Sequence, residues 1–350
     1  MNNTNKNQQQ PLIEVENLYK HFKVKNKGML HAVDGVSFSV RQGETLGLVG
    51  ESGCGKSTVG NVIMRLHQAT DGKVLFKGNN ILDSKGQESM DYKKKIQIIF
   101  QDPYSSLNPK KTINSIMQEA YSIHNLSSGT ERQKKIEEII ELCGLETYVL
   151  EKYPHELDGG KRQLIGIARA LSLGPEFIVC DEPVSSLDVS VQATIINLLM
   201  DLQKKMNLSF LFISHDLSVV RHISQRVAVM YLGQIIEMAD TDDIFADAYH
   251  PYTIALLSAV PKLDFDNKSS RIVLKGDVPS PINPPEGCRF APRCFMAEEI
   301  CKKERPELKP VGEGHCVACH FYQESQKRAS EIELGTVAKV DGGSDGYKNQ

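Results

Sequence analysis

Residues 45–58 read Thr45-Leu46-Gly47-Leu48-Val49-Gly50-Glu51-Ser52-Gly53-Cys54-Gly55-Lys56-Ser57-Thr58. A strand-like apolar run leads into the spacing G-x-x-x-x-G-K-S, and a helix-like stretch ending near Leu66 follows it. This order of strand, glycine-rich loop and helix is typical of a phosphate-binding loop. Glycines let the backbone curl so that its N–H groups face phosphate oxygens, and the helix N-terminus adds positive potential.

The side chains of this loop predict a nucleotide triphosphate as the ligand. Lys56 can reach the β- and γ-phosphates, and the Ser57 hydroxyl can ligate Mg²⁺. The predicted nucleotide-binding residues of the loop are Gly50, Glu51, Ser52, Gly53, Cys54, Gly55, Lys56, Ser57 and Thr58.

A second run, Phe177-Ile178-Val179-Cys180-Asp181-Glu182, places two carboxylates after four apolar residues. A buried strand of this kind delivers them at its C-terminal end, where ligands collect in open α/β sheets. We expect Asp181 to hold Mg²⁺, directly or through water, and Glu182 to polarise the attacking water. The pair alone would more often be a solvated strand end, but the upstream phosphate loop favours catalysis.

Composition bounds the class of protein. The chain has 350 residues, 40% of them hydrophobic, and a net charge of −3, which gives no electrostatic case for nucleic-acid binding. No apolar run approaches the ~20 residues of a membrane span, and the Asn/Gln-rich start lacks the apolar core of a signal peptide. We therefore expect a cytosolic protein whose eight cysteines do not form structural disulfides.

Strand-like runs alternate with helical spacing along most of the chain, which predicts an α/β fold with a mostly parallel sheet flanked by helices. The runs are 46–49, 74–76, 96–100, 177–180, 210–213 and 227–231. A long stretch of helical spacing between residues 100 and 177 predicts a helical insertion. The single phosphate loop predicts one nucleotide-binding domain.

Further motifs identify a family resemblance. Leu157-Asp158-Gly159-Gly160-Lys161-Arg162-Gln163 opens a helical run and resembles the L-S-G-G-Q signature of the ATP-binding-cassette (ABC) ATPases. Gln101 resembles the Q-loop residue, residues 185–188 resemble the D-loop, and His215 resembles the switch histidine. The order and spacing of these motifs agree over residues 12–238. The resemblance implies a core sheet with a helical subdomain, here about 102–172, within a nucleotide-binding domain at 11–260.

This resemblance also implies roles. Gln101 would touch Mg²⁺ and the attacking water and sense a membrane partner, and His215 would contact the γ-phosphate. Two such domains would sandwich two ATPs, with Asp158, Gly159 and Gly160 completing the partner's site. In the family, an aromatic residue upstream of the phosphate loop stacks on adenine. Phe22 is our first candidate for this residue and Tyr19 is the second. Alternatively, Phe22 is an aromatic residue of the core.

The C-terminal half narrows the resemblance to the oligopeptide/dipeptide permease ATPases, closest to their F subunit. The supporting stretches are 107–109, His250-Pro251-Tyr252-Thr253 and 279–288. This implies an ATPase that powers peptide uptake from the cytoplasmic face of the membrane as a peripheral subunit. Its implied partners are a D-type ATPase, two transmembrane permease subunits and, indirectly, an extracellular peptide-binding protein, with no nucleic acid. Alternatives are a nickel or other small-solute importer ATPase, a soluble ABC ATPase outside transport, and an iron–sulfur sensor.

We expect an irregular, proline-rich module at residues 261–324. Five of the eight cysteines lie in it. Their order is Cys288-x₅-Cys294-x₆-Cys301-x₁₇-Cys319, with Cys316 as a spare. Four thiolates can hold a [4Fe-4S] cluster, which the permease resemblance favours. Zinc is the rival because four thiolates also suit it, and unligated thiols are the third possibility. Residues 1–10 and 325–350 are expected to be disordered tails.

The signature departs from the family pattern at two positions. Asp158 stands where serine is expected and Lys161 where glutamine is usual. Aspartate still caps a helix well, but at ~4 Å a carboxylate and a phosphate charge repel by about 4 kcal/mol at an effective dielectric near 20. We therefore expect an asymmetric heterodimer in which the ATP site completed by Asp158 is slow or silent. The alternative is that both changes are tolerated.

Overall fold

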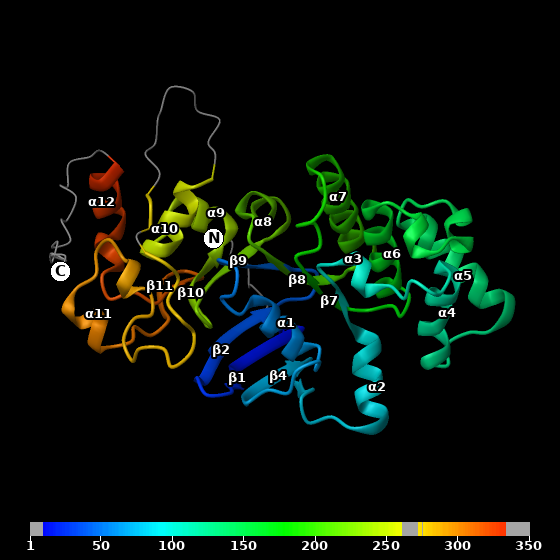
Figure 1. Cartoon of the computed structure of the whole chain (residues 1–350), viewed down its shortest axis with the longest axis horizontal. Coiled ribbons are helices and arrows are strands. Elements are labelled where there is room, and N and C mark those ends of the chain that lie inside the picture. The colour runs from blue at the N-terminus through cyan, green and yellow to red at the C-terminus, as the bar shows by residue number, and fades with distance from the viewer. Residues whose placement is uncertain (1–9, 261–271, 275, 334–350) are drawn as a thin grey trace, which may run out of the picture.

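The computed structural model describes residues 10–260, 272–274 and 276–333. Two sheets form its centre, an eight-stranded mixed sheet and a four-stranded antiparallel sheet. Figure 1 shows a helical lobe with α4, α5 and α6 at one end of the molecule and the C-terminal helices α11 and α12 at the other. No described helix combines the length and the apolar character needed to cross a bilayer.

The main sheet has the order β11-β12-β10-β9-β3-β8-β7-β6. Its parallel part comprises β9 (Arg226–Tyr231), β3 (Thr45–Val49), β8 (Ser209–Ser214), β7 (Phe177–Asp181) and β6 (Ile96–Ile99). All six runs predicted as strands fall on strands, five of them in the expected parallel core, whereas 74–76 belongs to the antiparallel sheet. The carboxyl ends of β3, β6, β7 and β8 meet at one edge of the sheet, which is where ligands bind in open α/β folds.

Both faces of the parallel strands are covered, so their residues alternate between two cores. On β7, Phe177 and Val179 pack into one core with α1 (Lys56–Ile63) and the antiparallel sheet. Ile178 and Cys180 pack into the other with α6 (Gly159–Leu171) and α7 (Val189–Met206). The helix α8 (Leu217–Ile223) and α9 (Thr241–Ala246) join this second core.

Helix α1 ends at Ile63, three residues before the predicted end near Leu66. Arg65 takes a left-handed φ of 59°, and the Leu66 N–H donates to the Asn61 carbonyl at 2.8 Å. This reversal closes the helix as a Schellman motif, here with arginine in place of the usual glycine.

The antiparallel sheet was not anticipated from the sequence. Its order is β2-β1-β4-β5, with bounds Gly28–Val40, Ile13–Val24, Asp71–Phe76 and Asn79–Asn80. The long hairpin β1–β2 has register shifts, and the alternation of apolar and polar residues is broken there. Helix α2 (Gly86–Lys95) then leads back to β6.

A helical lobe stands between β6 and β7, where helical spacing predicted an insertion. It contains α3 (Pro103–Ser106), α4 (Ile113–Ile123), α5 (Gly129–Leu142), two 3₁₀ turns at Thr147–Glu151 and Pro154–Glu156, and α6. Buried Ile116, Ile136 and Ile140 pack in its core. The exact limits 102–172 stay a prediction, as do the domain limits 11–260 and 261–324.

Most described residues between 272 and 321 are irregular, as expected, but the stretch is joined to the main sheet rather than appended to it. It contains a 3₁₀ turn at Ala291–Arg293, α11 (Glu299–Lys303), β11 (Lys309–Gly312) and β12 (His315–Val317). Strand β12 pairs antiparallel with β10 (Gln234–Asp240) and so extends the main sheet. The prolines and cysteines predicted irregularity, but His315 donates to the buried Glu237 carboxylate at 2.8 Å and fixes the strand.

The expectation of a tail from residue 325 is also wrong in part, because α12 spans Tyr322–Glu333. Ser325 and Ala329, four residues apart on one helix face, are buried. The Ser325 hydroxyl donates to the Tyr249 carbonyl, and α12 packs on α10 (Pro251–Ser258). Residues 1–9 and 334–350, the rest of the two predicted tails, lie outside the described residues.

Candidate functional site

The phosphate loop joins β3 to α1, and close approach of the backbone explains two of its glycines. Gly50 has φ 154°, and a Cβ there would lie 2.2 Å from the Met230 carbonyl oxygen. Gly55 has φ 108°, and its Cβ would lie 2.0 Å from the Ala32 carbonyl oxygen. Any side chain at either position would therefore push β9 or β2 away from the loop.

Lys56 is buried, and its ammonium group curls back over the loop. Nζ donates to the carbonyl oxygens of Gly50 at 2.8 Å and Glu51 at 3.0 Å. Both acceptors are neutral, so an anionic phosphate is a stronger partner for the same charge. The position suits a cation that bridges the loop and a bound phosphate.

Ser57 lies in the first turn of α1 and Asp181 ends β7, and their side chains meet directly. The Ser57 hydroxyl donates to Asp181 Oδ1 at 2.7 Å. Burial, together with the neighbouring charge of Glu182, raises the pKa of Asp181 against the opposing effects of Ser57 and Lys56. A hydroxyl and a carboxylate are hard oxygen ligands that fit Mg²⁺, and a divalent cation would also stabilise the charged form of Asp181.

Glu182 lies at the centre of a second group. Its Oε2 accepts from Gln101 Nε2 at 3.0 Å and contacts His215 Nδ1 at 3.2 Å. Glu182 has a left-handed φ of 45°, a conformation that costs energy for a residue with a side chain and that clusters at functional sites. The structure thus brings Gln101, Glu182 and His215 together at the carboxyl edge of the sheet.

A cavity of about 320 Å³ lies over the loop, within the range of small-molecule sites. Its lining includes Phe22, Ser52, Gly53, Gly55, Lys56, Ser57, Thr58, Gln101 and Glu182. Phe22 belongs to β1, and the edge of the His67 ring packs against it with 5.4 Å between centroids. Tyr19, the second adenine candidate, is not among the residues that line this cavity in the described part of the chain.

The signature residues lie elsewhere, at the N-terminus of α6. Asp158 is the N-cap, and its Oδ1 accepts the Lys161 backbone N–H at 2.8 Å. Gly160 faces α7, where a Cβ would meet Val191 at 2.8 Å. Among the described residues, Asp158, Gly159 and Gly160 do not line the cavity over the phosphate loop.

Four cysteines gather around one small apolar pocket, and they are the four that the permease resemblance implied as ligands. Cys288, Cys294, Cys301 and Cys319 line it together with His250, Phe290, Met296 and Phe321. Burial and the neighbouring thiols raise the pKa of Cys294 and of Cys319 to about 12. Cys316 points elsewhere, from β12, where Arg226 is its charged neighbour.

One group of possible metal ligands lies outside the cysteine pocket. Among the described residues, His21, His31 and Asp34 are the one set of three or more such side chains whose ligand atoms all lie within 4.8 Å of one another.

His21, His31 and Asp34 belong to β1 and β2, and Asp34 connects these strands to Arg289 in the C-terminal stretch. Asp34 Oδ1 lies 2.8 Å from His21 Nε2 and 3.2 Å from His31 Nδ1. Its Oδ2 accepts from Arg289, and Arg305 lies 3.5 Å away. With two arginines on the same carboxylate, the arrangement is a satisfied ion-pair network rather than a cation site.

The sequence did not predict the residues outside the phosphate loop that form hydrogen bonds with it. Arg293 makes two hydrogen bonds to the Glu51 carboxylate, and the Tyr252 hydroxyl accepts the Glu51 N–H at 2.9 Å. Pro281 lines the nucleotide cavity, and its carbonyl accepts the His31 N–H. The stretches containing Tyr252 and Pro281 were noted as motifs, but no local pattern predicts contacts across such sequence distances.

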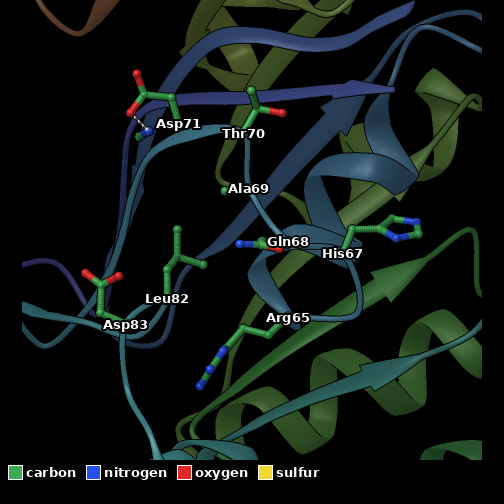
Figure 2. A pocket seen from close by; sticks show the side chains of 9 residues that line it. Arg65, His67, Gln68, Ala69, Thr70, Asp71, Leu82 and Asp83 are labelled. Atoms are coloured by element: carbon green, nitrogen blue, oxygen red, sulfur yellow. Dashed lines mark hydrogen bonds between the residues drawn. The ribbon is translucent and has the colours of Figure 1, made fainter. Parts of the chain in front are cut away.

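A second cavity of about 400 Å³ lies beyond the C-terminal end of α1. Figure 2 shows Arg65 directed away from Asp71, with Gln68 and Ala69 between them. Arg65 donates to the Ser84 hydroxyl at 2.7 Å and the Ser89 hydroxyl at 2.9 Å. The cavity's charged groups already have partners within the chain, and none of the motif residues lines it.

Two family models match the chain. The model described as "ABC transporter" matches residues 33–185, and that described as "Oligopeptide/dipeptide transporter, C-terminal region" matches residues 236–301. The first covers the phosphate loop and Asp181–Glu182, and the second covers β10 and three of the four pocket cysteines.

Curated relatives match over nearly their full lengths. The chain is 51% identical over 325 residues to the oligopeptide transport ATP-binding protein AppF of Bacillus subtilis, covering 90% of this chain and 98% of the relative. It is 48% identical over 315 residues to the dipeptide transport ATP-binding protein DppF of Haemophilus influenzae, covering 88% and 96%.

Solved structures share the cassette fold. The dimeric post-hydrolysis state of the ATP-binding cassette MJ0796, bound to ADP and Pi, aligns with a TM-score of 0.60 at 27% identity. It covers 65% of this chain and 98% of the other. A second dimeric structure of MJ0796 gives a TM-score of 0.59 at 28% identity, with the same coverage.

Proposed function

The chain belongs to the ABC transporter ATPases of the oligopeptide/dipeptide transport family, and from this premise we propose how it powers peptide uptake. It binds and hydrolyses ATP as a subunit of an importer of oligopeptides or dipeptides. The observation that carries this is the meeting of Ser57, Asp181, Glu182, Gln101 and His215 around the phosphate-loop cavity. Its relatives AppF and DppF are named for oligopeptide and dipeptide transport.

In this proposal each side chain acts on the triphosphate. Lys56 contacts the β- and γ-phosphates, and Phe22 stacks on adenine. Ser57, Asp181 and Gln101 would hold Mg²⁺, whose chemistry there would be to neutralise negative charge on the phosphates. Glu182 orients and polarises the attacking water, held in position by Gln101 and His215, and His215 reaches the γ-phosphate.

The second ATPase in the assembly is proposed to be a D-type subunit. Asp158, Gly159 and Gly160 lie at the start of α6, outside this chain's own cavity, which supports their use by a partner's ATP. The aspartate at the signature position supports an asymmetric pair in which the site completed by Asp158 is slow or silent. This chain's own site would then hydrolyse ATP against the partner's signature.

The remaining partners follow from the family. Two transmembrane permease subunits would hold this chain as a peripheral subunit at the cytoplasmic face of the membrane. An extracellular peptide-binding protein would supply the cargo. The net charge of −3 supports the absence of nucleic acid from this list.

The cysteine pocket is proposed to hold a [4Fe-4S] cluster. The support is that Cys288, Cys294, Cys301 and Cys319 line one small apolar pocket, where four thiolates could hold such a cluster. Such a cluster would cross-link four points of a stretch that has few apolar residues of its own, which is a structural role.

The decisive test uses the full complex in proteoliposomes. With the D-type ATPase, both permease subunits and the binding protein present, we expect peptide to stimulate ATP hydrolysis and to enter the vesicles. Nickel is assayed in parallel as the competing cargo. Stimulation by nickel and not by peptide would overturn the cargo, and ATP hydrolysis by the full complex without uptake of either cargo would overturn the transport function.

A further inference from the structure

One ion pair connects the cysteine-bearing stretch to the phosphate loop. Arg293 Nη1 lies 2.6 Å from Glu51 Oε2, and Nη2 lies 3.0 Å from Oε1. The two residues are 242 positions apart, and the Arg293 side chain is only 7% exposed. Two parallel bonds between a guanidinium and a carboxylate fix orientation as well as distance.

Glu51 is held at all three of its polar groups. Arg293 donates to the carboxylate, the Tyr252 hydroxyl accepts from the backbone N–H, and Lys56 donates to the carbonyl. When Lys56 turns toward a phosphate, its hold on that carbonyl weakens. The Cys54 N–H still donates to that carbonyl at 3.3 Å, but Arg293 and Tyr252 are then the contacts that hold Glu51 from outside the loop.

The anchor for Arg293 is rigid. It ends the 3₁₀ turn at Ala291–Arg293, immediately before Cys294, and its N–H donates to the Phe290 carbonyl at 2.9 Å. Phe290 is buried and packs edge-on against Tyr231 at 5.3 Å and near Tyr252 at 5.4 Å between centroids. The cysteine pocket, this aromatic cluster and the phosphate loop are therefore contiguous.

We propose that Arg293 is a positioning residue for the phosphate loop, which acts through Glu51 and couples the order of the cysteine-bearing stretch to MgATP affinity. The inference rests on the proposed function, because it needs the loop to bind MgATP. Arg293 itself does not touch the nucleotide cavity in the described residues. Its removal leaves the Glu51 carboxylate without its paired charge, and the loop's first turn is then free to move.

The test is a double-mutant cycle in the full transporter complex with Arg293→Met, Glu51→Gln and the two together. We expect each single variant to weaken MgATP binding by about tenfold, the usual size of a coupling between sites. The Michaelis constant for ATP should rise by the same factor while kcat changes less. The double variant should lose no more than either single variant, and Arg293→Lys should restore part of the affinity.

Arg328→Met is the matched control. Arg328 belongs to α12 and pairs with Glu298 and Glu324 at the surface, with no contact to the loop. Wild-type affinity in Arg293→Met, additive losses in the double variant, or an equal loss in Arg328→Met would each overturn the inference. If Arg293→Met does not fold, Arg293→Lys carries the test, since it keeps the charge but not the two parallel hydrogen bonds, and wild-type affinity in that variant would overturn the inference. Failure of the wild-type complex to bind MgATP would instead refute the proposed function.

Discussion

The Ser57 hydroxyl donates a 2.7 Å hydrogen bond to the Asp181 carboxylate, although the two residues lie 124 positions apart. The contact arises because β3 and β7 flank β8 in a parallel arrangement, so their carboxyl ends open on the same edge of the sheet. The phosphate loop after β3 carries Ser57 in the first turn of α1 to the end of β7, so that two hard oxygen ligands reach the same point. The neighbouring Glu182 adds to these Mg²⁺-binding groups a carboxylate that we propose polarises the attacking water.

Replacing Glu182 with glutamine should abolish most ATP turnover while MgATP binding persists. The amide keeps the size of the side chain but cannot act as a base, and such groups contribute about 10²–10⁴-fold. Steady-state ATPase and equilibrium nucleotide binding on the full complex measure both effects. Glu176→Gln is the matched control because Glu176 precedes the opposite end of β7 and pairs with Lys77 and Lys95. Substantial turnover in Glu182→Gln would contradict the assignment.

Replacing Phe22 with alanine should weaken MgATP binding by about two- to tenfold, the range that aromatic stacking supplies. Phe22→Trp should keep the affinity because it retains a ring over the cavity. Tyr19→Ala tests the competing candidate. If that variant loses more affinity than Phe22→Ala, Tyr19 is the adenine contact and Phe22 is a packing residue held by His67.

Asp34 predicts a pH-dependent loss of stability. Burial alone would raise the pKa of Asp34, but hydrogen bonds from His21 and His31 and the charge of Arg289 outweigh burial and lower it to about 2. A carboxylate whose pKa is depressed by folding stabilises the native state above its unfolded pKa near 4, and the contribution is lost as pH falls toward 2. Its size is about 2 kcal/mol.

Asp34→Asn should therefore lower the free energy of unfolding by about 2 kcal/mol at neutral pH and reduce the slope of stability between pH 4 and 2. Denaturant unfolding across that pH range measures both. Asp83→Asn, at an exposed carboxylate that accepts from Asn80, serves as the control. Equal slopes in the Asp34 variant and the wild type would show that this network does not stabilise the fold.

The two cysteines near the end of the sheet should differ sharply in metal content. Cys319 lines the pocket and Cys316 does not. In anaerobically purified protein we expect about four irons and four sulfides per chain in the wild type and in Cys316→Ser, and a large loss in Cys319→Ser. Zinc measured on the same samples decides between the two metals. Stoichiometric zinc lost in Cys319→Ser would replace the iron–sulfur proposal, and metal-free wild-type protein would end both.

Local patterns in the sequence predicted the nucleotide motifs because each is a short strand-to-loop junction. Gly50 to Thr58 and Asp181–Glu182 each follow an apolar run, so adjacency of parallel strands is enough to bring them together. The β1–β2 hairpin was not predicted, since its register shifts break the alternation of polar and apolar residues. The helix at Tyr322–Glu333 was missed because its stability comes from packing on α10, which no local propensity encodes.

The supports of the site were harder to predict than the site itself. Arg293 and Tyr252 reach Glu51 from 242 and 201 positions away, and nothing in their neighbours predicts the partner. The set of four pocket cysteines was predictable only through the family resemblance, because the stretch offers a fifth thiol, Cys316, that spacing alone does not exclude. Its attachment to the main sheet through β12 depends on His315 and Glu237, a buried pair that only the fold brings together.

Asp158→Ser should raise the ATPase rate of the whole complex. In the structure the Asp158 carboxylate caps α6 through the Lys161 N–H, and Lys161 Nζ lies 3.6 Å from its other oxygen. Serine caps a helix about as well, so α6 should keep its stability while the negative charge disappears. Asp158 is 64% exposed here, and a partner-bound γ-phosphate would bury it and thereby strengthen the repulsion.

If that charge silences one of the two ATP sites, its removal should make the silent site active. Turnover per complex should then rise by up to about twofold, the ratio of two working sites to one. Turnover at saturating ATP and the number of nucleotides trapped per complex are the measurements. Asp158→Asn removes the charge and keeps a good cap, so it should behave like serine. An increase with serine alone would assign the effect to the hydroxyl. Unchanged rate and stoichiometry in both variants would show that the signature tolerates aspartate and that both sites already turn over.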